Sequence, residues 1–306
     1  MPKITKKDIE SVTKFDVSEY VEKMIDDFNL EYETLNKNER DLTILSIINH
    51  LNDTLIQAGE HRLNQWEKGW SENSDLLKKG KSTFNLVPKY FGKNKIMRWN
   101  GDFIKSDIEN FDYKQLIIFV DSYLHQYVGH KFENLFEFGC GPSYHLLRFG
   151  NFNNEINLIG LDWTKSSQDI INEINNLGIN NKIKGYNFDF FNPDYDIDIP
   201  SNSAIFTCSA LEQIGTSYKK FIDFIISKKP DLCINFEPMT EFLDEDILID
   251  KLSILYSKKR NYLDGYLSYL EELHQQGKIE IILKNRLYGG SIYLEGYPIV
   301  IWKVKK

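Results

Sequence analysis

The stretch FEFGCGPSYHLL, residues 136–147, decides the fold of this chain. It runs from apolar residues through two glycines and a proline into a helical pattern. Gly139 and Gly141 let the backbone turn tightly and approach a ligand, and Pro142 suits the first position of a helix. Backbone N–H groups at such a helix start can hold the anionic part of a ligand. The stretch therefore predicts a strand, a ligand-binding turn and a helix in succession.

Further apolar runs of strand length follow this stretch, and helical patterns separate most of them. Helices are expected over 170–177, over 218–227 and after Thr240. Strands that alternate with helices form a mostly parallel sheet with helices on both faces. The last two runs have no helix between them, so they should pair antiparallel at one edge. We therefore predict an α/β, Rossmann-like fold with a seven-stranded sheet and an antiparallel edge strand. The runs are LFEFG (135–139), INLIGLD (156–162), IKGYNFD (183–189), AIFTCSA (204–210), LCINFEP (232–238), IEIILK (279–284) and PIVIWKV (298–304).

Residues 1–129 differ in pattern and predict a mainly helical extension before a domain of residues 130–306. Two sets of apolar residues at helical spacing mark amphipathic helices. The sets are Leu42, Leu45, Ile48, Leu51 and Leu55, and Leu116, Ile117, Val120 and Leu124. Between them lies an aromatic and basic stretch with several Gly and Pro residues. Its segment 84–104 is either a lid over the ligand site or a packing layer, and the helices offer an interface for a homodimer.

Composition limits the classes of function. The 306 residues carry a formal net charge of −8, so we expect no nucleic-acid partner. With 42% hydrophobic and 14% aromatic residues, the chain can build a sizeable core. It has no apolar run of transmembrane length and no signal-peptide core, so we expect a cytoplasmic protein without a membrane partner. Cys140, Cys208 and Cys233 lie among apolar residues, without zinc-binding spacing, and are expected as small buried side chains.

Two carboxylates follow the strands next to the glycine turn. Asp162 ends the second run, where a carboxylate can accept hydrogen bonds from both hydroxyls of a ribose. Asp189 ends the third run, and Phe190 and Phe191 after it offer apolar faces to a flat ring that carries an amino group. Each acid also has a structural interpretation. Asp162 either binds a ribose or caps the next helix beside Thr164, and Asp189 is either a ligand contact or an ordinary loop acid.

The glycine pattern distinguishes between two nucleotide-containing ligands. A dinucleotide fingerprint needs a small residue at the last position of G-x-G-x-x-G/A, and Tyr144 stands there. The pattern E-x-G-x-G-x-G fits better. Its positions are filled by Glu137, Gly139, Gly141 and, in place of the third glycine, Ser143. With this pattern, residues 130–306 resemble the class I S-adenosylmethionine-dependent methyltransferases. GLDW, FDFF, TCSALEQIG and NFEP after successive strands, together with the closing antiparallel pair, carry the same resemblance.

The resemblance implies S-adenosylmethionine as cofactor and S-adenosylhomocysteine as product. Gly139 and Gly141 would line the methionine part of the cofactor, with Ser143 at the third position of the pattern. Glu137 would orient the turn and the cofactor's ammonium group, and its structural alternative is a salt bridge at the strand end.

The resemblance also implies residues for the adenosine part and the sulfonium. Asp162 would bind the ribose, and Trp163 would pack on the adenine. The adenine amino group would bind Asp189, and Phe190 would cover the ring. Thr207 or Cys208 would offer a backbone carbonyl near the sulfonium.

Catalysis of methyl transfer depends mostly on positioning, and an alcohol acceptor also loses a proton to a base. Candidate bases near the carboxyl edge of the sheet are Glu212, Glu237 and His145, with the two glutamates preferred. Each has a structural alternative: a helix cap for Glu212, a turn residue for Glu237 and packing for His145. No cluster of His, Cys or carboxylate residues has the spacing of metal ligands, so we expect no metal.

Candidate acceptor-binding residues lie in two segments. Arg98, Trp99 and Asn100 would face the acceptor if segment 84–104 is a lid. Arg260 and Tyr262 belong to KKRNYLDGY, which either holds a phosphate or carboxylate or is a solvated basic surface. Four aromatic residues either stack on a sugar ring or anchor the N-terminal layer, and they are Trp66, Trp70, Tyr90 and Trp99. Packing is the preferred interpretation for Trp66 and Trp70.

A more distant resemblance concerns the acceptor. QWEKGW, PKYFGKNKIMRWNG, GLDWTKSSQ and KRNYLDGY resemble methyltransferases associated with bacterial surface-polysaccharide synthesis. This resemblance implies O-methylation of a saccharide, a nucleotide sugar or a polysaccharide-linked group. Two alternatives stay open: N-methyl or aminopropyl transfer to a small amine, and a non-catalytic scaffold that binds the cofactor.

Overall fold

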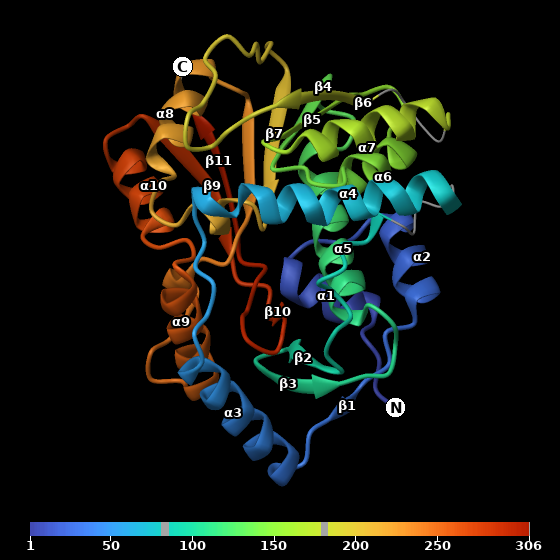
Figure 1. The fold of residues 1–306 in the computed structure, drawn as a ribbon, viewed down its shortest axis with the longest axis vertical. Coiled ribbons are helices and arrows are strands. Elements are labelled where there is room, and N and C mark those ends of the chain that lie inside the picture. The colour runs from blue at the N-terminus through green and yellow to red at the C-terminus, as the bar shows by residue number, and fades with distance from the viewer. Residues whose placement is uncertain (81–85, 179–182, 306) are drawn as a thin grey trace.

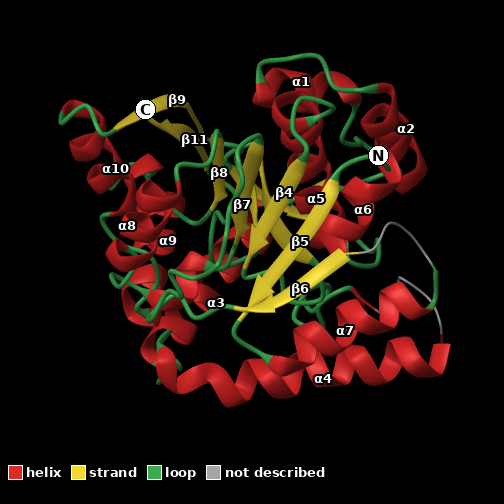
Figure 2. Ribbon diagram, turned by 90° about the horizontal axis from the view of Figure 1, so that it is seen from above, coloured by secondary structure: helices red, strands yellow, loops and turns green. Residues whose placement is uncertain are grey.

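A seven-stranded sheet lies at the centre of the molecule (Figure 1, Figure 2). The computed structural model describes residues 1–80, 86–178 and 183–305. The strands of this sheet are β4 (Asn134–Phe138), β5 (Asn157–Asp162), β6 (Ile183–Asn187), β7 (Ser203–Cys208), β8 (Leu232–Phe236), β9 (Ile279–Asn285) and β11 (Ile299–Val304). Their spatial order is β6-β5-β4-β7-β8-β11-β9. Each predicted run forms one of these strands, which confirms the α/β fold and its seven-stranded sheet.

The position of β4 determines where a ligand can bind. β4 pairs parallel with β5 on one side and with β7 on the other, so the sheet grows first in one direction and then in the other. Ligands of open α/β sheets bind at such a reversal, beyond the carboxyl ends of the strands. β11 pairs antiparallel with β8 and with β9. The predicted antiparallel pair at one edge is therefore confirmed. The strand that is antiparallel to the rest of the sheet is β11, which lies between β8 and the edge strand β9.

Helices connect most of these strands. The α-helices of the described residues are α1 (Lys6–Thr13), α2 (Glu19–Phe28), α3 (Lys37–Asn52), α4 (Leu63–Gly80), α5 (Phe111–Tyr123), α6 (Tyr144–Phe152), α7 (Lys165–Asn176), α8 (Lys219–Lys228), α9 (Leu248–Arg260) and α10 (Tyr266–Gln275). The helices predicted near 170–177, near 218–227 and after Thr240 correspond to α7, α8 and α9. Within the described part of the chain, no helix combines the length and the apolar character that crossing a bilayer requires.

Side chains of the sheet alternate between its two faces, and each face buries its own apolar cluster. Leu135 and Phe136 are neighbours in β4 but belong to different clusters. The cluster of Leu135 includes side chains of α5, α6 and α7. The cluster of Phe136 includes Trp302 and side chains of α8 and α10. Period-two alternation in the strands thus places helices on both faces, as predicted.

A second, four-stranded sheet lies in the N-terminal part, where the sequence patterns predict helices and irregular structure. Its strands, in spatial order, are β1 (Glu33–Thr34), β3 (Asp102–Lys105), β2 (Ile96–Trp99) and β10 (Gly289–Gly290). β2 and β3 form a hairpin whose turn residues, Asn100 and Gly101, have φ of +51° and +83°. An Asn-Gly pair between apolar runs favours this turn, so the sequence did contain the signal. β10 comes from the connection between β9 and β11, so both ends of the chain build this sheet.

Helix α3 forms as predicted but buries a different face. Thr43 and Ile47 are buried, whereas Leu42, Leu45 and Ile48 are 57%, 54% and 40% exposed. Ile47 joins a small cluster with side chains of α9, against which α3 packs. The apolar residues that predicted this helix are therefore mostly exposed in the chain, and the buried face is the neighbouring one.

The hairpin places Arg98 in the interior. Arg98 is 2% exposed, and it donates a hydrogen bond to the carbonyl oxygen of Ile249 at 2.9 Å. Its second terminal nitrogen lies 3.4 Å and 3.3 Å from the carbonyl oxygens of Ile292 and Tyr293. Burial lowers the pKa of Arg98 to about 10. Arg98 thus joins β2 to α9 and to the connection between β9 and β11.

Trp99 is also interior, with 5% of its surface exposed and its ring 6.1 Å from that of Phe119. Residues 84 and 85, at the start of the segment considered as a lid, lie outside the described residues. The described remainder of the segment forms the hairpin and a preceding loop, so Arg98 and Trp99 take part in packing.

Arg98→Ala should destabilise the fold. The substitution removes the donor from buried carbonyl groups, and each unsatisfied group costs about 1–3 kcal/mol. We expect the free energy of unfolding, measured by urea denaturation, to fall by about 3 kcal/mol. The control Lys95→Ala removes a side chain that is 79% exposed and paired with Asp107, and it should leave the midpoint unchanged. Equal midpoints for wild type and Arg98→Ala would contradict a packing role.

Candidate functional site

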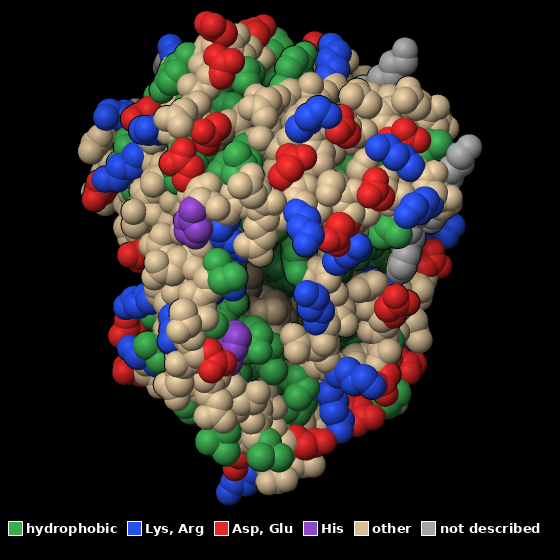
Figure 3. All heavy atoms as spheres, viewed as in Figure 1, with side chains coloured by type: hydrophobic (Ala, Val, Ile, Leu, Met, Phe, Trp, Pro, Cys, Tyr) green, Lys and Arg blue, Asp and Glu red, His purple; other side chains and the backbone are tan. Residues whose placement is uncertain are grey.

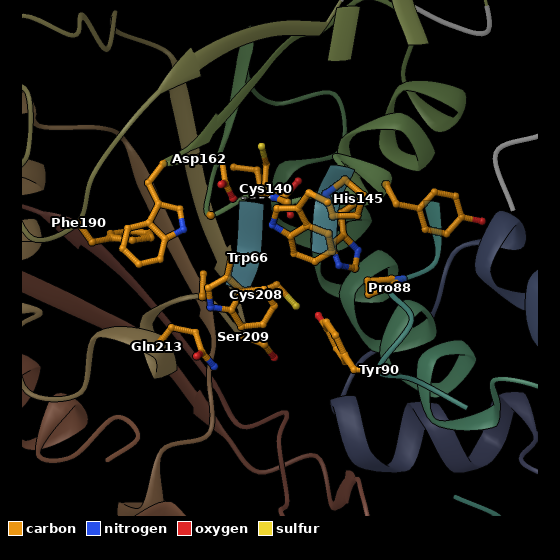
Figure 4. A pocket seen from close by; sticks show the side chains of 18 of the residues that line it. Trp66, Pro88, Tyr90, Cys140, His145, Asp162, Phe190, Cys208, Ser209 and Gln213 are labelled. Carbon is orange, nitrogen blue, oxygen red and sulfur yellow. Dashed lines mark hydrogen bonds between the residues drawn. The ribbon is translucent and has the colours of Figure 1, made fainter. Parts of the chain in front are cut away.

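A pocket opens beyond the carboxyl ends of β4, β5 and β7, where the strand order reverses. The empty space of the pocket, counted together with its open mouth, is about 860 Å³. Helix α4 crosses in front of these strand ends (Figure 1), and the face below α4 is hollowed (Figure 3). The side chains around the pocket come from the glycine turn, the ends of β5 and β7, and the N-terminal part (Figure 4).

The glycine turn follows β4, and three of its residues have backbone conformations with positive φ. Gly139, Gly141 and Ser143 have φ of +74°, +48° and +57°. The N–H of Gly139 donates to the carbonyl of Leu161 at the end of β5, at 2.7 Å. A Cβ on Gly139 would overlap the Cβ of Ala210, so no side chain fits there. Ser143 adopts a conformation that favours glycine, and it is fully buried behind the pocket wall rather than in it.

Glu137 brings a buried carboxylate to the pocket. It is 2% exposed, and the N–H of Leu146 in α6 donates a hydrogen bond to it. Its Oε2 has no hydrogen-bond partner among the described residues. Burial raises the pKa of Glu137 well above its usual value, and the nearby carboxylate of Asp162 raises it further. An unpaired carboxylate oxygen on a pocket wall is suited to bind a cationic group of a ligand.

Asp162 caps helix α7 and also lines the pocket. Its Oδ1 accepts hydrogen bonds from the N–H and the hydroxyl of Thr164, at 2.9 Å and 2.7 Å, at the start of α7. Its Oδ2 accepts one from the N–H of Gly141 at 3.0 Å. Asp162 also lines the pocket (Figure 4). Because a carboxylate oxygen can accept two hydrogen bonds, Oδ2 retains capacity for a ligand hydroxyl.

Aromatic side chains line the pocket next to Asp162. Trp163, Phe190 and Phe191 all line it, and the rings of Trp163 and Phe191 lie 6.0 Å apart. Asp189 does not line it, because its two oxygens accept hydrogen bonds from the N–H of Phe191 and the side chain of Asn192. The structure therefore brings Trp163 and Phe190 to the pocket and places Asp189 in its own turn.

The N-terminal part supplies a roof over the glycine turn. Trp66 and Trp70 of α4 stack at 5.6 Å, and Tyr90 packs edge-on against both. All three line the pocket. Trp70 lies directly on the turn, because a Cβ on Gly141 would come within 2.8 Å of its ring. The sequence signal was the spacing of four in QWEKGW, which places both tryptophans on one helix face.

A carboxylate of α4 anchors this roof to the sheet. Glu67 accepts hydrogen bonds from the N–H groups of Lys165 and Ser166, at 2.7 Å and 3.0 Å. These N–H groups open α7, so Glu67 caps that helix from a distant part of the chain. The hydroxyl of Ser166 donates back to the carbonyl of Glu67 at 3.0 Å. Figure 2 shows α4 and α7 side by side.

Beyond β7, the wall of the pocket consists of small and polar residues. Cys208, Ser209, Ala210 and Gln213 line it. Thr207 is fully buried behind them and accepts a hydrogen bond from the side chain of Asn235 at 3.0 Å. The side chain of Thr207 therefore belongs to the structure beneath the site.

The three candidate bases occupy different environments. Glu237 is fully buried outside the pocket lining and accepts hydrogen bonds from the N–H groups of Ala210 and Glu212, at 3.1 Å and 3.2 Å. Burial raises the pKa of Glu237 to about 8. Glu212 follows the pocket-lining Ala210 and is less buried, and burial raises its pKa to about 7. Glu237 thus supports the loop on which Glu212 stands.

His145 lines the pocket at the start of α6. Its Nδ1 is buried without a hydrogen-bond partner in the described part of the chain. Burial lowers the pKa of His145 to about 4, so the ring is neutral at pH 7. A neutral ring with a free nitrogen can exchange a hydrogen bond with a ligand.

The acceptor-binding candidates separate into two groups. Arg98, Trp99 and Asn100 do not line the pocket and belong to the hairpin. Tyr262 lies next to the pocket, because its hydroxyl is hydrogen-bonded with the pocket-lining Gln213. Arg260 lies beside Tyr262, 4.9 Å from the centre of its ring. Burial raises the pKa of Tyr262. Among the residues that the structure describes, no group of three or more His, Cys, Asp and Glu is placed to hold a metal ion.

Comparison with known proteins identifies structures with a similar fold but assigns this chain to no family. The chain matches no family model, and it matches no curated protein. The solved structure of the [4+2]-cyclase SpnF matches with a TM-score of 0.50 and 14% identity, over 82% of this chain and 97% of SpnF. PigF with SAH matches with a TM-score of 0.48 and 14% identity, over 87% of this chain and 69% of that chain.

A third structure, magnesium protoporphyrin IX methyltransferase (ChlM) from Synechocystis PCC 6803 with bound SAM, matches at 11% identity with a TM-score of 0.45. It covers 78% of this chain and 97% of its own. At these identities the likeness to SpnF establishes a shared Rossmann-like fold. The function of this chain has to be argued from its own site.

Gly139→Ala should destabilise the protein through a clash. Gly277 provides a matched control, because its φ of +72° is close to the +74° of Gly139 while nothing lies within 4 Å of its Cβ position. Gly277→Ala should cost about 1 kcal/mol, the strain of a left-handed alanine. Gly139→Ala should cost about 1–3 kcal/mol more, because Ala210 must move. Urea denaturation measures both, and equal losses would show that the contact with Ala210 is unimportant.

Glu237→Gln should change how stability depends on pH. The pKa of Glu237 is raised to about 8 in the folded state, so the folded state holds its proton more tightly than the unfolded state. That contribution to the free energy of unfolding is complete near pH 4 and is lost as the pH rises through about 8. We expect wild type to lose more free energy of unfolding than Glu237→Gln between pH 5 and about 8. Parallel curves from urea denaturation at several pH values would contradict the raised pKa.

Proposed function

We propose that this chain binds S-adenosylmethionine and transfers its methyl group to a small-molecule acceptor. The observation that carries the proposal is the buried, unpaired Oε2 of Glu137 beside the Gly139–Ser143 turn, at the reversal of a parallel sheet. Asp162 and a group of aromatic rings stand on the same pocket. A ligand that contains an ammonium group, a ribose and a flat nucleobase fits this arrangement of side chains.

The residues of the chain would hold the cofactor as follows. Glu137 would bind the ammonium group, because its free oxygen otherwise remains buried without a partner. Asp162 would accept a ribose hydroxyl with Oδ2 while it keeps the glycine turn in place. The rings of Trp163 and Phe190 would cover the adenine, with Phe191 beside them. Asp189 is left out of this set of residues, because it does not line the pocket.

When bound, S-adenosylmethionine supplies a methyl group activated by a positively charged sulfur. The acceptor oxygen would form its bond to the methyl carbon as the carbon–sulfur bond breaks and leaves its electron pair on sulfur. Glu212 would take the hydroxyl proton of the acceptor, and its pKa of about 7 suits a base near neutral pH. The roof of Trp66, Trp70 and Tyr90 would exclude water from the reacting atoms.

The class of acceptor is inferred from the aromatic side chains of the pocket. Trp66 and Tyr90 offer aromatic faces to the pocket, and this supports a ring-shaped acceptor such as a saccharide or nucleotide sugar. Nothing in the comparisons points to surface-polysaccharide synthesis, so that finer role stays a prediction from sequence. The same holds for a cytoplasmic location and for a homodimer, which the exposed Leu42 and Leu45 of α3 would support.

A second function follows from the match to SpnF. That protein is described as a [4+2]-cyclase, so this fold also supports chemistry other than methyl transfer. Under this alternative the chain would bind the cofactor without consuming it. Incubation with methyl-labelled S-adenosylmethionine and a set of hydroxylated acceptors separates the two, because only a transferase releases S-adenosylhomocysteine in step with labelled product.

Binding measurements with two ligands test the cofactor assignment. S-adenosylhomocysteine carries the ammonium group, whereas methylthioadenosine has the same nucleoside without it. Glu137→Gln should weaken S-adenosylhomocysteine about 10-fold or more and leave methylthioadenosine unchanged, since a hydrogen bond to a charged group contributes about 1.5–3 kcal/mol. Asp162→Asn should weaken both ligands. Calorimetry provides the affinities, and NAD should not bind.

Two outcomes would refute this assignment. If S-adenosylhomocysteine does not bind to the wild type, the assignment of S-adenosylmethionine as the cofactor is wrong. If Glu137→Gln lowers the affinity for both ligands equally, Glu137 does not bind the ammonium group and only caps α6.

A further inference from the structure

Arg62 is a buried cation with neutral hydrogen-bond partners. It ends a short turn, Glu60–Arg62, before α4 and is 6% exposed. Its guanidinium donates to the side-chain oxygens of Gln65 and Gln213 and lies 5.0 Å from the ring centre of Trp66. Within the described ranges, no carboxylate is within ion-pair distance of it. The charge of Glu212 raises the pKa of Arg62 without forming an ion pair with it. Because this buried guanidinium is compensated only in part, an anionic ligand would stabilise it further.

Arg260, which is only partly buried, is a second cation near Arg62. It ends α9, lies 4.9 Å from the ring centre of Tyr262, and donates to the hydroxyl of Tyr256 at 3.4 Å. Its Nε is buried without a partner in the part of the chain that the structure describes. Burial lowers the pKa of Arg62, and the charge of Arg260 lowers it further, so the two guanidinium groups lie near each other.

The backbone holds this pair in place. The N–H of Ala58 donates to the carbonyl of Arg260 at 2.7 Å, and the side chain of Asn261 donates to the carbonyl of Ala58 at 3.2 Å. These bonds attach the segment before α4 to the end of α9. The positions of Arg62 and Arg260 are therefore determined together.

The pair borders the pocket behind Gln213. Gln213 lines the pocket, accepts a hydrogen bond from Arg62 and interacts with the hydroxyl of Tyr262. Figure 4 shows Gln213 next to Ser209, on the side of the pocket away from His145. The charges of Arg62 and Arg260 both act on the neighbouring Glu212 and lower its pKa against the larger effect of burial.

Other buried arginines of the described chain have different partners. Arg148 pairs with Asp121, and Arg286 pairs with Asp250 and Glu295. Arg98 donates to backbone carbonyls. In contrast, Arg62 and Arg260 form no ion pair with any described residue and share one neighbouring carboxylate, that of Glu212, so a ligand can supply further negative charge.

We propose, on the basis of the methyltransferase function proposed above, that Arg62 and Arg260 bind an anionic group of the acceptor, a carboxylate or a phosphate. Planar guanidinium groups recognise such oxygens with paired hydrogen bonds. Tyr256 and Tyr262 support the bound group from the side, and the acceptor hydroxyl is then held next to Glu212. The acceptor is therefore an anionic hydroxylated molecule, and a neutral sugar alone does not satisfy the site.

Simple anions test this site without knowledge of the natural acceptor. Phenyl phosphate and benzoate represent the two anionic groups, and phenol is the neutral comparison. Each is titrated calorimetrically into wild type, Arg62→Met and Arg260→Met, with and without saturating S-adenosylhomocysteine. We expect the anions to bind wild type better than phenol does and to bind each variant about 10-fold more weakly, as the loss of a charge-assisted hydrogen bond predicts.

Matched controls separate charge from folding and from cofactor binding. Lys89→Met removes an exposed lysine near the pocket that pairs with Glu72, and it should leave anion affinity unchanged. Arg62→Lys keeps the charge and removes the planar group, so it should bind the anions with intermediate affinity. The affinity for S-adenosylhomocysteine should change less than about twofold in all variants, which excludes misfolding.

The proposal fails if the anions bind the arginine variants as tightly as wild type, or if phenol binds wild type as tightly as phenyl phosphate. Either result leaves binding of S-adenosylhomocysteine intact, so it does not affect the proposed methyltransferase function. The titrations without S-adenosylhomocysteine keep the anion site testable even if the cofactor does not bind. The stronger of the two anions identifies a phosphate or a carboxylate as the group recognised.

Discussion

The rest of the site depends on the buried carboxylate of Asp162. One of its oxygens holds the glycine turn through the N–H of Gly141, and the other holds the start of α7 through Thr164. Three elements, the turn after β4, the end of β5 and the start of α7, thus share one side chain. A carboxylate suits this position because it accepts several hydrogen bonds at once. These hydrogen bonds offset the free-energy cost of burying the charged group. These hydrogen bonds fix the wall of the pocket at the glycine turn.

A second carboxylate makes the N-terminal part a structural component of the pocket. Glu67 caps α7 from α4 and thereby fixes the helix that carries Trp66 and Trp70 over the glycine turn. The roof is therefore connected to the same helix that Asp162 holds from below. The N-terminal residues also share a core cluster and a small sheet with the C-terminal residues. The site thus belongs to the whole chain rather than to residues 130–306 alone.

Burial is the common cause of the unusual protonation around the pocket. It raises the pKa of Glu137, Glu212 and Glu237 and lowers that of His145. Glu237 compensates for its burial by holding backbone N–H groups, whereas an oxygen of Glu137 and the pair of Arg62 and Arg260 keep unused capacity. Glu137 lines the pocket, and the two arginines lie behind Gln213, which also lines it. Under the proposals above, a cofactor ammonium group would bind Glu137, and an anionic group of the acceptor would bind the arginines.

The sequence by itself determined the strands, the glycine turn and Asp162, because these depend on local patterns: period-two apolar runs, positive φ at Gly139 and Gly141, and an acid at a strand end. Tertiary structure alone decided the face that α3 buries, the interior position of Arg98, and the meeting of Arg62 with Arg260. These features depend on contacts between segments far apart in the chain, such as 58–62 with the end of α9. A local pattern contains no information about such a partner, because the same basic residue forms a surface in one tertiary setting and a buried site in another.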